Sequence, residues 1–111
     1  MEGIKEFINN TCADLNVILT VRENDNPGCI FRREEFCLHI GECKKVCFGN
    51  EFNPFLDCIC ACYCEFGQCA STELAVRKRG SAVDRFINNT PKIFFLNAGP
   101  SIVITSLHWC H

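Results

Sequence analysis

Four cysteines alternate with other residues in one short segment near the middle of the chain. The segment LDCICACYCEFGQC places Cys58, Cys60, Cys62 and Cys64 at every second position, and Cys69 follows. In an extended strand every second side chain points to the same face, so four thiols would line one face of one strand. A hydrophobic core does not require this arrangement. The spacing therefore indicates sulfur chemistry: disulfides, a metal site or redox reactivity.

The redox compartment decides between these possibilities. The chain has 11 cysteines in 111 residues, a density that marks disulfide-rich secreted chains or metal-rich intracellular ones. The first residues include Glu2, Lys5 and Glu6 and contain no apolar run of signal-peptide length, and no segment has the length of an apolar membrane span. We therefore expect the nucleus or cytoplasm, with reduced thiols. The odd number of cysteines agrees, since a complete set of internal disulfides needs an even number.

Reduced thiols at this density favour zinc, which takes four thiolate or imidazole ligands in structural sites. Cys43 and Cys47 are four residues apart, and a helix would place both on one face. The strand would supply two more ligands, from Cys58 and Cys60 or from Cys60 and Cys62. The other candidate ligands, some of them for a second site, are Cys12, Cys29, Cys64, Cys69, His108, Cys110 and His111.

Other interpretations of the sulfur-rich sequence stay open. Some thiols are expected to be small buried side chains, and Cys29 and Cys37 fit this role best. A disulfide scaffold would need an export signal, and thiols two residues apart on a strand pair poorly with each other. His39 and a nearby cysteine would form a nucleophile and base only with a third, orienting group, which the sequence does not show. We therefore predict no catalytic site.

Hydrophobic patterns predict the elements that would position these residues. Residues 15–22 are rich in β-branched and aliphatic side chains and predict a strand, as do residues 92–96 and 101–107, which a turn at 97–100 would join. Apolar residues spaced as on a helix face predict helices over 32–47 and 71–87. The expected fold is a single α+β domain of residues 1–111, with a mixed sheet, two helices and stabilisation by zinc.

The charge balance argues against a dedicated nucleic-acid-binding protein. The formal net charge is -2, from 11 basic and 13 acidic side chains, whereas nucleic-acid-binding domains are usually strongly basic. A zinc module that binds phosphates is the alternative. Its basic residues would be Arg32, Arg33, Arg77, Lys78 and Arg79.

An ordered series of short motifs resembles the central part of the adenovirus early region 4 34-kilodalton protein family. The first motifs are R-E-E at 33–35 and C-x-x-x-C at 43–47. The sequence L-x-C-x-C at 56–60 and Q-C at 68–69 follow. The series ends with Arg85 and Phe86, the segment N-T-P-K at 89–92 and a strand that contains Phe95. Cys12 lies at a matching distance before the first motif. The resemblance covers roughly residues 10–107.

This resemblance implies zinc binding and a role in the infected cell. The implied ligands are Cys12, Cys43, Cys47, Cys58, Cys60 and Cys69. Family proteins are longer, and they join a second viral early protein to a host cullin–elongin ubiquitin ligase. Leu56 and Cys60 match the first half of the family's elongin-binding box, and Cys64 occupies its third place. We therefore expect a viral early adaptor that binds host and viral proteins in the host nucleus or cytoplasm.

Overall fold

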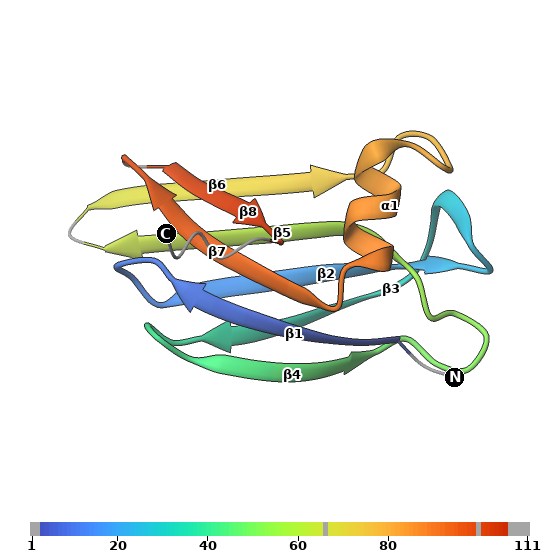
Figure 1. Ribbon diagram of the computed structural model, residues 1–111, viewed down its shortest axis with the longest axis horizontal. Coiled ribbons are helices and arrows are strands. Elements are labelled where there is room, and N and C mark those ends of the chain that lie inside the picture. The colour runs from blue at the N-terminus through green and yellow to red at the C-terminus, as the bar shows by residue number, and fades with distance from the viewer. Residues whose placement is uncertain (1–2, 66, 100, 107–111) are drawn as a thin grey trace.

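The computed structural model describes residues 3–65, 67–99 and 101–106, which form two four-stranded β-sheets packed face to face (Figure 1). Sheet A contains β4 (Cys43–Phe48), β1 (Gly3–Asn10), β7 (Lys92–Ala98) and β8 (Ser101–Thr105), in that order. Sheet B contains β3 (Asn26–Leu38), β2 (Leu15–Glu23), β5 (Leu56–Glu65) and β6 (Gln68–Ala75). Helix α1 (Ala82–Asn89) lies at one end of the sandwich. Strands β1 and β7 are parallel, and the other neighbouring strands are antiparallel.

The expected α+β fold with two helices is wrong, because the described residues are mainly β. Residues 32–47 form the end of β3, a turn and most of β4 instead of a helix. Phe36 pairs with Val17 of β2, and Gly41 adopts a φ of 76° in the turn. Such a positive φ suits glycine and ends a strand sharply. Pairing with β2 thus outweighs the helix-like spacing of the apolar residues.

The helix expected over 71–87 is also only partly present. Ser71 and Thr72, which resembled a helix cap, pair with Cys62 and Ala61 in the ladder between β5 and β6. The helix starts later, after Ser81, whose side chain accepts a hydrogen bond from the Asp84 amide at 3.2 Å. This bond satisfies one of the free amides of the first turn.

Three sequence-based expectations are confirmed. The strand predicted at 15–22 is β2, and the cysteine segment is strand β5. The two strands predicted near the end of the chain are β7 and β8, which pair antiparallel. Strands β2 and β8 are rich in β-branched residues, so local pattern and tertiary pairing agree there.

The core lies between the two sheets. Phe7 of β1 is fully buried, and its ring centroid lies 6.1 Å from that of Phe95 and 5.4 Å from that of Phe36. The aromatic rings thus connect β1 and β7 of sheet A with β3 of sheet B. Burial of one large apolar side chain stabilises the fold by about 1.5–3 kcal/mol. The buried apolar cluster consists of Phe7, Leu15, Val17, Leu19, Val21, Leu38, Phe48, Leu56, Ile59, Ala61, Val76, Ile87, Ile93, Phe95 and Ile102.

A buried cation joins four parts of the fold. The Arg22 side chain is 1% exposed and contacts Asp25 at 2.7 Å, Asp84 at 2.9 Å and Asp57 at 3.6 Å. These contacts connect β2 with the turn that follows it, with β5 and with α1. In the part of the chain that is described, no helix has the length and hydrophobicity to cross a membrane.

Candidate functional site

The thiols of β5 lie in a row on the outer face of sheet B. Cys58, Cys60 and Cys62 are half-buried, and they alternate with Ile59 and Ala61, which are fully buried in the core. This alternation confirms that the cysteines of the segment share one face of a strand. We call Cys58, Cys60 and Cys62 the thiol row.

The neighbouring strands flank the thiol row with mostly short or polar side chains, and Ile18 is the exception. On the β2 side, Thr20, Ile18 and Asn16 pair with Cys58, Cys60 and Cys62, respectively. On the β6 side, the corresponding partners are Ala75, Glu73 and Ser71. A hollow of about 380 Å³ opens over part of this face. Its lining includes Cys58, Cys60, Asp57, Glu73, Arg33 and Arg77.

The surroundings keep Cys58 and Cys60 protonated. Burial, followed by the charges of Glu73, Cys60 and Asp57, raises the pKa of Cys58 to about 12. Burial and the charges of Cys62 and Glu73 raise the pKa of Cys60 as well. Because the thiolate is the nucleophilic form, both cysteines are poor nucleophiles at neutral pH.

A disulfide follows the thiol row along β5. Cys64 is bonded to Cys69, which lies directly opposite on β6, and their Cα atoms are 4.1 Å apart. The expectation of fully reduced thiols therefore fails for this pair. A metal can bind Cys64 or Cys69 only after the disulfide is reduced, because the thiolate is the metal-binding form.

The remaining predicted ligands lie elsewhere. Cys43 and Cys47 are exposed on β4 in sheet A, and four strand residues separate their positions by about 13 Å. At this distance the two thiols cannot bind one ion together. On the expected helix they would have been close enough to do so. The Cys43 thiol donates a hydrogen bond to Glu6 Oε2 at 2.7 Å, which raises the pKa of Cys43. Cys12 is exposed after β1, and its amide donates to Asn97 Oδ1 at 2.7 Å.

The structure thus distributes the predicted zinc ligands over both sheets. Within residues 3–65, 67–99 and 101–106, no three His, Cys, Asp or Glu side chains are arranged to hold a metal ion. The six ligands that the resemblance implies do not fit a single zinc site. His108, Cys110 and His111 lie outside the described residues. Cys29 and Cys37, which were expected to be buried, are exposed on β3.

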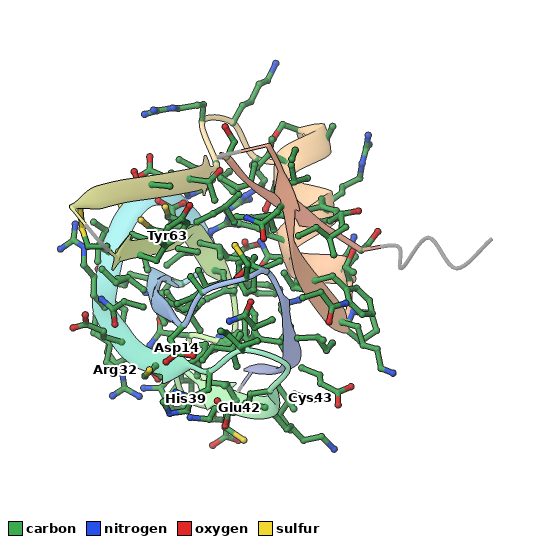
Figure 2. The ribbon with its side chains drawn as sticks, turned by 90° about the vertical axis from the view of Figure 1, so that its left-hand side faces the viewer. Asp14, Arg32, His39, Glu42, Cys43 and Tyr63 are labelled. Carbon is green, nitrogen blue, oxygen red and sulfur yellow. A yellow bond between two sulfur atoms is a disulfide. The ribbon has the colours of Figure 1, made fainter. Side chains whose placement is uncertain are left out.

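At the turn between β3 and β4, the structure adds Asp14 to the pair of His39 and a nearby cysteine, and nothing in the sequence indicated Asp14. His39 Nδ1 lies 3.4 Å from Asp14 Oδ2 (Figure 2). The same nitrogen lies 3.9 Å from the Cys37 sulfur. Asp14 Oδ1 accepts a hydrogen bond from the Ile40 amide at 2.9 Å, and this bond, followed by His39, lowers the pKa of Asp14. Both contacts of His39 use the same ring nitrogen. A catalytic triad instead needs one nitrogen for the nucleophile and the other for the carboxylate.

The outer face of sheet A carries a different kind of surface. Ile8 of β1 lies beside Phe94 of β7, and Leu96 of β7 lies beside Val103 of β8. The residues next to them in sequence point into the core instead, namely Phe7, Ile93, Phe95 and Ile102. Val103 is 39% exposed, and the other three are partly buried. We call Ile8, Phe94, Leu96 and Val103 the apolar face.

No family model, curated protein or solved structure matches this chain. The resemblance to the adenovirus early region 4 34-kilodalton family, based on short motifs, therefore remains a prediction.

Proposed function

We propose that the protein is a protein-binding adaptor with no catalytic activity of its own. The observation that carries this proposal is the apolar face, which extends over β1, β7 and β8. Contiguous exposed apolar side chains mark protein interaction sites in many soluble proteins. The flanking row formed by Lys45, Glu6 and Lys92 is charged, as is usual at the rim of an interface.

The state of the thiols supports a role without catalysis. The raised pKa of Cys58 and Cys60 leaves almost no thiolate at neutral pH. The Cys37, His39 and Asp14 cluster uses one imidazole nitrogen for two contacts. Neither arrangement activates a nucleophile.

The family resemblance suggests the partners. We propose a viral early regulatory protein that binds a host cullin–elongin ligase and a second viral early protein, in the host nucleus or cytoplasm. Leu56, the first residue of the suggested elongin-binding box, is fully buried in β5. Partner binding through the apolar face needs no change in β5, so we assign binding to that face.

Substitution of the apolar face tests the proposal. We expect the double variant Leu96→Lys and Val103→Lys to lose co-elution with a purified cullin–elongin complex, because two buried charges would oppose docking. Ile30→Lys is the matched control, since Ile30 is 43% exposed on β3 of the other sheet. The proposal fails for this partner if the wild-type protein does not co-elute, or if both variants bind as the wild type does.

The alternative is a nucleic-acid-associated or structural zinc module. Binding of mixed-sequence DNA or RNA distinguishes the two functions, because phosphate contacts make affinity fall steeply with salt. The adaptor proposal expects no such binding at physiological salt.

A further inference from the structure

We propose that the thiol row binds a soft monovalent metal ion, Cu(I), between Cys60 and one of its two neighbours, Cys58 or Cys62. The site would lie on the outer face of sheet B. It is therefore separate from the apolar face of sheet A, and it goes beyond the adaptor function.

The position of the three sulfurs is the first argument. Same-face residues on a strand are about 6.6 Å apart along the chain, so each neighbouring pair presents two thiols side by side. Thiolates select soft ions such as Cu(I). Because Cu(I) is stable with only two thiolate ligands, one pair is sufficient.

The surroundings of the row are the second argument. Cys58 and Cys60 line the hollow of about 380 Å³, so an ion can reach them. Glu73 supplies negative charge that attracts a cation. Two thiolates and one Cu(I) together carry one negative charge, and Arg33 and Arg77 in the same lining can balance it.

Binding is an exchange of protons for metal without oxidation or reduction. Two S–H bonds break, two S–Cu bonds form, and two protons pass to the solvent. The apparent affinity therefore rises with pH while both thiols are protonated in the free protein. Two released protons give about a 100-fold increase for each pH unit.

Competition for Cu(I) against the chelator bicinchoninate, with ascorbate as reductant, tests the proposal. Ascorbate keeps copper reduced, and the Cys64–Cys69 disulfide is confirmed by thiol counting before each titration. We expect one Cu(I) per chain with the 100-fold dependence on pH. Cys60→Ser removes a member of both possible pairs and should weaken binding by about 100-fold or more, whereas Cys58→Ser or Cys62→Ser should each leave one pair.

Cys47→Ser is the matched control, because Cys47 is an exposed thiol on a strand of the other sheet. It should bind Cu(I) as the wild type does. The proposal is overturned if Cys60→Ser binds Cu(I) as tightly as the wild type does. It is also overturned if only Cys37→Ser loses Cu(I) binding, because the ion would then lie beside His39. If Cys60→Ser does not fold, the number of Cu(I) ions bound by the wild type and the pH dependence of its Cu(I) affinity test the proposal. Release of fewer than one proton for each Cu(I) bound overturns the site. Cullin–elongin binding by folded Cys60→Ser tests the adaptor function separately.

Discussion

Arg22 Nη2 donates a hydrogen bond to Asp84 Oδ1 at 2.9 Å, and this contact joins strand β2 to helix α1 inside the protein. Asp84 also accepts hydrogen bonds from the Gly80 amide and from Asn88, each at 2.8 Å. Burial alone would raise the pKa of Asp84, but the bonds from Gly80, Arg22 and Asn88 outweigh it and lower the pKa. The carboxylate is therefore held charged opposite the buried cation.

We expect Arg22→Met to destabilise the protein by about 3–5 kcal/mol, because it leaves buried carboxylates without their cation. Urea denaturation at pH 7 measures this change. Arg85→Ala, on the exposed side of α1, should change the free energy of unfolding by less than about 0.5 kcal/mol. A loss below 1 kcal/mol for Arg22→Met would show that the network contributes little to stability.

Lys5 is a second buried cation, and it predicts a specific dependence of stability on pH. Its side chain faces the inside of sheet A and donates to the Thr90 carbonyl, and burial lowers the pKa of Lys5 to about 8. In the unfolded chain the pKa is about 10.4. Between these values the unfolded state binds more protons, so stability rises with pH, by at most about 1.4 kcal/mol per pH unit.

The rise should disappear in Lys5→Met. Cys58 has the opposite effect, because its raised pKa makes stability fall above the unfolded thiol pKa of about 8.5. The measured quantity is therefore the difference in unfolding free energy between the wild type and Lys5→Met, from pH 7.5 to 10.5, in which the cysteine contribution cancels. Lys45→Met, at an exposed position of β4, should give a flat difference. A difference between the wild type and Lys5→Met that does not change with pH would mean that Lys5 is not buried as described.

The sequence predicted those strands in which local pattern and tertiary pairing agree. In β2, Leu15, Val17, Leu19 and Val21 form an alternating apolar series, and all are buried. Strand β1 escaped prediction because its inward positions include the polar residues Lys5 and Asn9. Their burial depends on partners distant in sequence, such as the Leu38 carbonyl, which accepts from Asn9 Nδ2 at 2.8 Å.

The candidate site was predictable only in part, for the same reason. Alternation along one strand sufficed to place Cys58, Cys60 and Cys62 on one face. The separation of Cys43 from Cys47 and the approach of Asp14 to His39 depend on the strand β4 and on the turn before it. Because a helix was expected there, neither the separation of the two cysteines nor the contact between Asp14 and His39 was predicted.

The raised pKa of Cys58 predicts slow alkylation. A pKa of about 12 leaves roughly a thousand-fold less thiolate at pH 7.5 than an ordinary thiol of pKa near 9, and half-burial restricts access further. We expect iodoacetamide to modify the exposed Cys47 well before Cys58, as measured by peptide mass spectrometry over time. Glu73→Gln removes a charge that opposes ionisation and should speed the modification of Cys58. Rapid alkylation of Cys58 in the folded wild type would contradict its protected state.

Chelation tests whether zinc holds the fold together. The two sheets enclose a continuous cluster of buried apolar side chains, from Phe7 to Ile102, that includes residues of both sheets and of α1. Structural zinc contributes about 10–16 kcal/mol in small zinc domains, whereas a 1 kcal/mol change shifts Tm by about 4–8 °C in a domain of this size. Since the six implied ligands do not meet at one point, we expect EDTA to shift Tm by less than about 2 °C. Loss of the cooperative transition in EDTA, restored by added Zn²⁺, would instead show that zinc is structural and that its ligands assemble differently.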